Sequence, residues 1–149
     1  MLNLFKNYCE ELAQFENPAL EMPTDAAERV FERYQRNPET RIQGITDNGQ
    51  LVGFLITQRP ILAGVDLRIC EAYVSPWHRG KGLMRQSVKE AVSGDDMLIR
   101  MKIFHLNQRA KDFWLPLMDE CGFKLVCARP DDEWIGTYFF TNKKYLATD

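Results

Sequence analysis

The chain has 149 residues, of which 45% are hydrophobic and 11% aromatic, enough for one hydrophobic core but short for two. Its formal net charge of -2 and its pI of about 5.7 supply no electrostatic attraction to nucleic acid or to an anionic membrane. The apolar runs are much shorter than the ~20 residues that span a bilayer. We therefore expect a single domain over residues 1–149, with neither nucleic acid nor a membrane as its partner.

The number and spacing of the cysteines indicate whether the chain forms disulfides or binds a metal. The four cysteines, Cys9, Cys70, Cys121 and Cys127, form no C-x-x-C pair and have no histidine at zinc-ligand spacing. The N-terminus lacks the charged and apolar regions of a signal peptide. We expect reduced, mostly buried thiols in the cytoplasm, with no disulfide framework and no metal site.

Two helices are predicted before the first strand. Near the N-terminus an apolar face at helical spacing ends before Asn17-Pro18, and no further element is assigned to residues 1–23. Asp25, followed by Glu28 as in a capping box, begins a second helix that ends before Pro38.

A run of β-rich segments follows these helices. Residues 41–46 and 51–58 flank the turn Asp47-Asn48-Gly49-Gln50, where Asn and Gly accept positive φ, so the pattern predicts a hairpin. After a loop over residues 59–64, residues 66–74 are predicted as a third strand. Two antiparallel neighbours are therefore expected early in the sheet.

The second half of the chain alternates helices and strands. One helix is expected to begin at the glycine turn Arg79-Gly80-Lys81-Gly82 and to end at Gly94, and another is capped by Asn107 and closed by Gly122. Pro116 predicts a kink or a restart in the latter, because it removes one helix hydrogen bond. Further strands are predicted at 97–104, 123–128 and 134–140. The fold class is therefore α/β, with a mixed sheet.

Residues 74–84, with the sequence VSPWHRGKGLM, join a predicted strand to a predicted helix through a short basic turn. The first amides of a helix are unpaired, and the peptide dipoles add about half a positive charge there, so such a turn can hold an anion. Gly80 and Gly82 let the backbone approach that anion because they have no β-carbon. The turn predicts a phosphate site, although the pattern alone is too common to name the ligand.

Two ordered motifs give this chain a family resemblance. Arg79, Gly82 and Met84 occupy the places of the Q/R-x-x-G-x-G/A turn with which the GCN5-related N-acetyltransferases (GNAT) bind acetyl-coenzyme A (acetyl-CoA), with methionine as the last residue. One strand later, Asn107-x-x-Ala110-x-x-Phe113-Trp114 and Gly122-Phe123 resemble the N-x-x-A-x-x-F-Y and G-F elements of that family. The resemblance covers residues 24–141.

The resemblance implies an acyl-CoA N-acyltransferase fold, in which helices flank a central mixed sheet with a splayed parallel strand pair. It implies that the pantetheine arm of acetyl-CoA lies in the gap between those two strands. The residues that it assigns to the cofactor are Ala72, Tyr73 and Val74 for the pantetheine amides, Arg79, Gly80, Lys81, Gly82, Leu83 and Met84 for the pyrophosphate, and Asn107 and Trp114 beside the arm.

The resemblance also implies direct transfer of the acetyl group to a primary amine, which must first lose a proton. Glu71, on the strand that faces the thioester, is one candidate base, and His105, at the end of the partner strand, is another. Each has a plain alternative, an outward-facing glutamate or a hydrogen-bonded loop histidine. The tyrosine that acts as general acid in the family is replaced by Trp114, whose indole is not an acid.

The sequence leaves the acceptor and the oligomeric state open. A small molecule, a peptide and a protein amine all remain candidates for the acceptor. A homodimer remains a candidate for the assembly. The acidic turn Asp131-Asp132-Glu133 could attract a cationic amine, or it could be a solvated hairpin turn. The missing tyrosine and Met84 also leave a second hypothesis, a non-catalytic module that binds coenzyme A (CoA) or a protein partner on the same fold.

Overall fold

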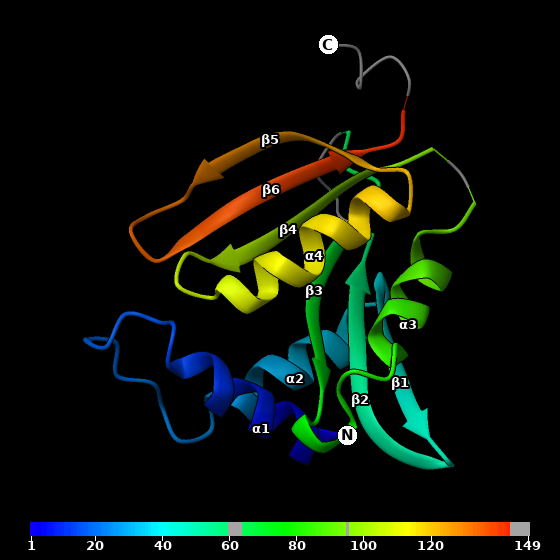
Figure 1. The fold of residues 1–149 in the computed structure, drawn as a ribbon. Coiled ribbons are helices and arrows are strands. Elements are labelled where there is room, and N and C mark those ends of the chain that lie inside the picture. Colours follow the sequence, from blue (N-terminus) through cyan, green and yellow to red (C-terminus); the bar gives the residue numbers. More distant parts are fainter. Residues whose placement is uncertain (60–63, 95, 144–149) are drawn as a thin grey trace.

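The computed structural model of the protein describes residues 1–59, 64–94 and 96–143, and its centre is a six-stranded sheet (Figure 1). The strands lie in the order β1-β2-β3-β4-β6-β5, and every neighbouring pair is antiparallel except β3 and β4. The strand bounds are β1 Thr40–Asp47, β2 Gln50–Gln58, β3 Leu67–Val74, β4 Leu98–Phe104, β5 Lys124–Pro130 and β6 Ile135–Thr141. The predicted strands and the mixed α/β fold class are confirmed. Of the predicted loop over 59–64, residues 60–63 lie outside the described residues.

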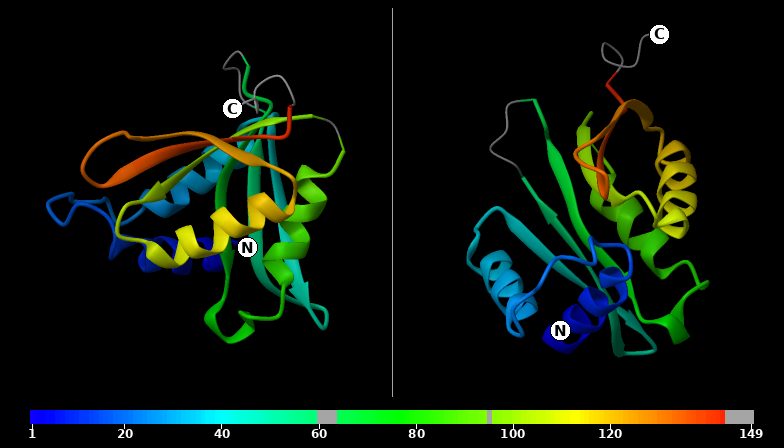
Figure 2. Two further views of the ribbon diagram at one scale, coloured as in Figure 1. Left: turned by 45° about the horizontal axis from the view of Figure 1, so that its top comes forward. Right: turned by 90° about the vertical axis from the view of Figure 1, so that its left-hand side faces the viewer.

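Helices cover both faces of the sheet, with α1 and α2 on one face and α3 and α4 on the other (Figure 2). The helix bounds are α1 Leu2–Ala13, α2 Ala26–Arg36, α3 Leu83–Val92 and α4 Gln108–Glu120, and a short 3-10 turn, η1, spans Pro76–His78. Phe5 of α1 and Phe31 of α2 are buried with Phe54 of β2 in one core cluster. Val88 of α3 and Met118 of α4 are buried in a second cluster on the other face. Among the described residues, no helix combines the length and the apolarity that crossing a membrane requires.

The parallel strands β3 and β4 part along their length. Their pairing joins residues 67–69 of β3 to residues 99–101 of β4, and β3 then continues to Val74 with no strand partner on that side. Figure 1 shows the two arrows diverging, with α4 in front of them. The predicted splayed parallel pair is therefore confirmed.

One extra residue interrupts the regular alternation of β3. Glu71 pairs with Ile56 of β2 and Ile69 pairs with Thr57, which leaves Cys70 as a bulge. Side chains alternate between faces along a regular strand, so positions 68 and 71 would otherwise fall on opposite faces. The bulge turns both toward the face that carries α1 and α2.

Two helix details differ from the sequence prediction. Asp25 stands at the N-cap of α2, but its carboxylate accepts a 2.7 Å hydrogen bond from Arg29 Nε and forms no capping bond. Helix α4 continues through Pro116, so the predicted restart is wrong. Leu117 and Met118, directly after the proline, are buried in the core, and this packing holds the helix together where one backbone hydrogen bond is lost.

Candidate active site

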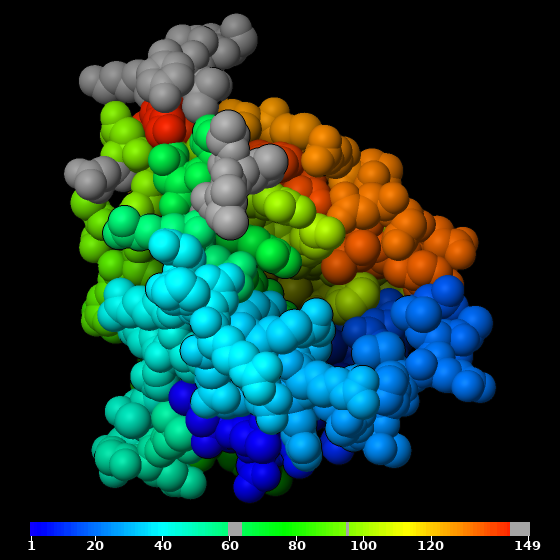
Figure 3. All heavy atoms as spheres, turned by 180° about the vertical axis from the view of Figure 1, so that it is seen from behind, coloured from blue at the N-terminus to red at the C-terminus, as the bar shows by residue number. Residues whose placement is uncertain are grey.

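Two cavities meet where β3 and β4 part. Cavity one, of about 490 Å³, lies between α1, the end of β3 and the N-termini of α3 and α4. Cavity two, of about 630 Å³, lies between α1, the segment before α2, the middle of β3 and the end of β4. On the side of cavity two, Figure 3 shows a recess between the blue N-terminal segment and the orange β5–β6 hairpin. Both volumes fall in the range of small-molecule sites.

The junction of the two cavities is formed by residues that line both. They come from α1, β3 and the first turns of α4, and they are Tyr8, Leu12, Ala72, Asn107, Ala110 and Trp114. The Asn107 side chain accepts a 3.1 Å hydrogen bond from Ala110 N and so caps α4, as predicted. Molecules that entered the two cavities separately would meet at this junction.

The glycine turn offers open backbone to cavity one. Gly80 and Gly82 line the cavity with φ angles of 80° and 78°, and a β-carbon on either would meet nothing within 4 Å. Gly82 is the N-cap of α3, so the unpaired first amides and the dipole of that helix favour a negative charge here. Leu83 and Met84, in the first turn of α3, line the same cavity. This geometry fits the pyrophosphate that the resemblance implies.

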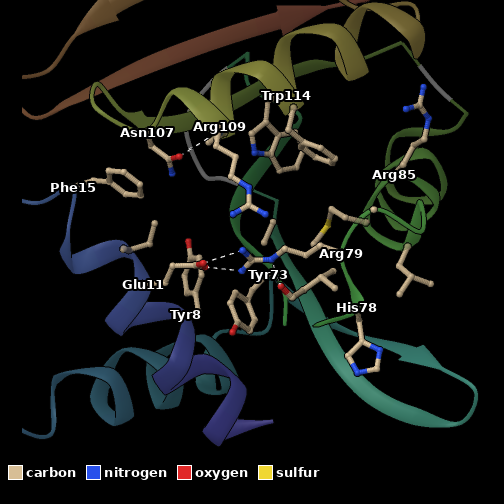
Figure 4. A pocket seen from close by; sticks show the side chains of 18 of the residues that line it. Tyr8, Glu11, Phe15, Tyr73, His78, Arg79, Arg85, Asn107, Arg109 and Trp114 are labelled. Atoms are coloured by element: carbon tan, nitrogen blue, oxygen red, sulfur yellow. Dashed lines mark hydrogen bonds and ion pairs between the residues drawn. The ribbon is translucent and has the colours of Figure 1, made fainter. Parts of the chain in front are cut away.

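The basic side chains of the turn are already engaged. Arg79 donates from Nε to the Val74 carbonyl oxygen (2.7 Å), and from Nη1 and Nη2 to the Glu11 carboxylate (2.9 and 2.7 Å; Figure 4). Lys81 Nζ lies 2.7 Å from Asp47 Oδ2, and Lys81 does not line cavity one. The Arg79 side chain therefore reaches the cavity as an ion pair, and the Lys81 side chain is not brought to it.

The predicted pantetheine strand lies along cavity one. Ala72, Tyr73 and Val74 line the cavity on the stretch of β3 that has no β4 partner. The Val74 carbonyl is taken by Arg79, whose guanidinium carbon also lies 5.5 Å from the centre of the Tyr73 ring. The rest of this strand edge can pair with the amides of an extended ligand.

Glu71 lines cavity two and is held by two tyrosines. Tyr8 of α1 donates a 2.8 Å hydrogen bond to Oε1, and Tyr34 of α2 donates a 2.7 Å hydrogen bond to Oε2. Burial raises the pKa of the Glu71 carboxyl above its ordinary value, while the two tyrosines and the charge of Arg68 act in the opposite direction. Burial and then the negative charge of Glu71 raise the pKa of Tyr8 well above its ordinary value. Tyr8 and Glu71 thus form a hydrogen-bonded pair of titratable groups beside the junction.

His105 is not brought to this site. It lines neither cavity, and its Nε2 lies 3.0 Å from the carbonyl oxygen of Asp132 in the β5–β6 turn. The ring packs beside Gly136, where a β-carbon would approach it to 3.0 Å. His105 therefore matches the alternative expected from the sequence, a hydrogen-bonded loop histidine, and it supports the β5–β6 hairpin.

The acidic turn is also turned away from the cavities. Asp131 accepts a 2.7 Å hydrogen bond from Thr137 Oγ1 and lies 3.0 Å from Lys102 Nζ. Asp132 Oδ1 accepts hydrogen bonds from the backbone amides of Trp134 and Ile135. Residues 131–133 line neither cavity, so the hypothesis that they attract a cationic amine is not supported.

Three site residues escaped the sequence analysis. Tyr8 and Glu11 lie on α1, where the pattern gave only a helix, and nothing in their spacing separates a core tyrosine or surface glutamate from side chains that reach β3 and the glycine turn. Arg109 projects from the first turn of α4 into cavity one (Figure 4), and no carboxylate among the described residues pairs with it. Its only sequence signal was its position two residues after Asn107.

The comparisons with known proteins agree with this geometry. Residues 6–123 match the sequence pattern of the acetyltransferase (GNAT) family, while no curated protein matches the chain in sequence. An acetyltransferase from Thermus thermophilus is 19% identical, with a TM-score of 0.69 over 94% of this chain and 87% of that one.

Two further solved structures share the fold at low identity. A diaminobutyrate acetyltransferase from Paenibacillus lautus is 14% identical, with a TM-score of 0.64 over 99% of this chain and 89% of that one. A spermidine N-acetyltransferase from Vibrio cholerae is 18% identical, with a TM-score of 0.61 over 97% and 89%. The family pattern matches well over half of the chain and spans both motifs, so the predicted resemblance is confirmed: this chain belongs to the acetyltransferase (GNAT) family.

Proposed function

We propose that this chain is an acetyl-CoA-dependent N-acetyltransferase that passes the acetyl group directly to a primary amine. The observation that carries the proposal is the junction between the two cavities. Cavity one has an anion-binding helix N-terminus, cavity two has the buried Glu71 carboxylate, and Tyr8 lines both. A thioester held from cavity one and an amine held from cavity two would meet beside groups that can move a proton.

Cavity one suits two parts of acetyl-CoA, its phosphates and its pantetheine arm. The open backbone at Gly80 and Gly82 and the charge of Arg109 can hold phosphates, and the unpaired edge of β3 can pair with pantetheine amides. The Vibrio cholerae and Paenibacillus lautus structures both contain CoA, which supports the same ligand here. Acetyl-CoA supplies the acetyl thioester.

Glu71 is the base in this proposal. A primary amine is largely protonated at neutral pH and becomes a nucleophile only when it loses a proton. Burial raises the pKa of Glu71, which makes its carboxylate a stronger base than an exposed glutamate, and its place in cavity two puts it where the amine would bind. His105 has no part in the proposal, because it lines neither cavity.

Tyr8 is the general acid in place of the family tyrosine. Transfer forms the amide C–N bond and breaks the thioester C–S bond, and the proton lost by the amine must finish on the sulfur. Tyr8 can give its hydroxyl proton to the sulfur while Glu71, 2.8 Å away, replaces it with the proton taken from the amine. Because the negative charge of Glu71 helps to raise the pKa of Tyr8, protonation of Glu71 makes Tyr8 a better acid.

The cysteines of cavity two support direct transfer rather than an acyl-cysteine. Cys9 and Cys70 both line the cavity. Burial raises the pKa of Cys9 to about 11 and that of Cys70 to about 12, so neither is a thiolate at neutral pH. The thiolate is the nucleophilic form of cysteine, and these two side chains are therefore poor acyl carriers.

Calorimetric titration with acetyl-CoA, paired with a thiol-release assay over a panel of amines, tests the proposal. We expect binding of acetyl-CoA together with release of CoA thiol that depends on an amine. Absence of binding at millimolar acetyl-CoA refutes the proposal. Binding without thiol release for any amine supports the non-catalytic module instead.

A further inference from the structure

We propose that the acceptor amine carries a carboxylate, and that Arg68, with Arg100 beside it, binds that group. This rests on the proposed function and names its class of substrate: amino acids and related zwitterionic amines rather than polyamines. The evidence is Arg68 on the strand wall of cavity two, with Arg100 opposite it on β4, and no carboxylate of the described residues forms an ion pair with either arginine.

Arg68 differs from the other cations of cavity two in its lack of an anionic partner among the described residues. Three basic side chains line the cavity, Lys6, Arg68 and Lys102. Lys6 is paired with Glu28 at 2.6 Å and Lys102 with Asp131 at 3.0 Å. In the part of the chain that the structure describes, no carboxylate lies within 4.0 Å of the Arg68 guanidinium. Its donors are therefore available to a ligand.

Arg100 adds a second positive charge behind Arg68, although it does not itself line cavity two. Arg68 and Arg100 are directly opposite each other in the parallel ladder of β3 and β4, so their side chains leave the sheet on the same face. Nε of Arg100 is buried and finds no hydrogen-bond partner within the described ranges. Two adjacent guanidiniums repel each other, and a buried donor without a partner is unfavourable. A bound anion would relieve both, and the planar donors of arginine match a carboxylate.

The proposed base lies on the same wall. Arg68 and Glu71 are three residues apart on β3, roughly 10 Å along a strand, and the Cys70 bulge turns both toward cavity two. The charge of Arg68 reaches Glu71, whose pKa it lowers against the effect of burial. An amine at Glu71 and a carboxylate at Arg68 can therefore belong to one molecule.

The remaining charges of the cavity are of both signs. Lys6 and Lys102 are each paired with a carboxylate, whereas Glu10, Glu16 and Glu71 line the cavity with no ion pair among the described residues, as Arg68 does. A zwitterion can meet charges of both signs, whereas a polyamine would place a positive charge against Arg68.

The test compares each common amino acid with its carboxamide, and adds putrescine and spermidine, in the thiol-release assay. The carboxamide keeps the shape and the amine and has no negative charge. We expect the best acid to exceed its amide by about 10- to 100-fold in kcat/KM, the range of one charged hydrogen-bonded pair. Arg68→Gln should remove this preference by raising KM for the acid, Arg68→Lys should restore part of it, and Arg41→Gln, on β1 and outside both cavities, should leave it unchanged.

The outcomes separate the two proposals. Equal turnover of acids and amides, or a preference for polyamines, overturns the carboxylate site while the acetyltransferase proposal stands. An Arg68→Gln variant that keeps the preference for acids also overturns it. If no amine of either kind releases CoA thiol, the proposed function itself fails.

Discussion

The hydroxyl of Tyr8 in α1 donates a 2.8 Å hydrogen bond to Oε1 of Glu71 in β3, 63 positions later in the chain. The other carboxylate oxygen accepts a 2.7 Å hydrogen bond from Tyr34, which lines neither cavity. One tyrosine therefore holds the carboxylate from inside the site and the other from outside it. This difference allows the positioning of Glu71 to be separated from the passage of its proton.

Glu71→Gln should lower kcat by about 10²- to 10⁴-fold, the range for loss of a general base, while acetyl-CoA binding is retained. The amide keeps the size of the carboxyl and cannot accept the amine proton. Steady-state kinetics and calorimetry measure the two effects on one preparation. Glu39→Gln, an exposed glutamate outside both cavities, is the control and should match the unaltered chain. Unchanged turnover in Glu71→Gln would remove Glu71 as the base.

Tyr8→Phe should lower kcat by about 100-fold, because it removes both the proton path to the sulfur and one hydrogen bond to Glu71. Tyr34→Phe removes only a hydrogen bond to Glu71, so its kcat at the pH optimum should fall by no more than a few-fold. Single-turnover measurements of acetyl transfer compare the two variants directly. Equal losses in both would mean that Tyr8 only positions the carboxylate.

In Tyr34→Phe, the rise of kcat with pH should occur at a higher pH than in the unaltered chain. Glu71 must be deprotonated to act, so kcat rises with pH through the pKa of Glu71. The Tyr34 hydrogen bond lowers that pKa by favouring the charged carboxylate, so its loss raises the pKa. The acid limb of the kcat profile should move to higher pH by about one unit. A shift to lower pH, or none, would contradict the role given to this tyrosine.

Gly82→Asp should abolish acetyl-CoA binding in calorimetry. It adds a negative charge at the N-cap of α3, in the open space proposed for the pyrophosphate. The matched control is Gly82→Ala, which carries the same backbone strain at a φ of 78°, about 1–2 kcal/mol, without the charge. We expect Gly82→Ala to bind with reduced affinity. If the two variants bind equally, repulsion of phosphate is not the cause.

The Arg79–Glu11 pair should couple α1 to the glycine turn. The two contacts are 2.9 and 2.7 Å long and both side chains are partly buried, so Glu11→Gln and Arg79→Gln should each lower the free energy of unfolding. In a double-mutant cycle measured by urea unfolding, we expect a coupling energy of about 1 kcal/mol. A coupling near zero would show that α1 and the turn are held together by other contacts.

The sequence predicted the elements well because their signals are local. Turn chemistry at residues 47–50 and hydrophobic periodicity located every strand, and Asn107 was recognised as a helix cap. Of the two outcomes predicted for Pro116, the restart was wrong because the propensity of one residue was weighed without the buried Leu117 and Met118 that hold α4 together.

The site was predicted only where a motif marks it. Gly80 and Gly82 and the face of β3 were identified because backbone geometry requires particular residue types there. Tyr8, Glu11 and Arg68 are placed by contacts that cross the fold or the sheet, and no spacing in a single sequence reports such contacts. His105 was overvalued because a titratable side chain at a strand end was credited before its partner in the β5–β6 turn was known.

The bulge at Cys70 acts as a change of phase in the two-residue period of β3. The strand before it presents Arg68 to cavity two, and the strand after it presents Glu71, whereas an uninterrupted strand would present only one of them. Substitutions at position 70 leave this phase intact, because it depends on the number of residues and not on their kind. Deletion of that single residue would turn inward side chains outward, and outward side chains inward. The change would extend from position 70 to the nearest strand pairing that stays in register. Chain length at this point is therefore as much a determinant of the site as the identity of any side chain in it.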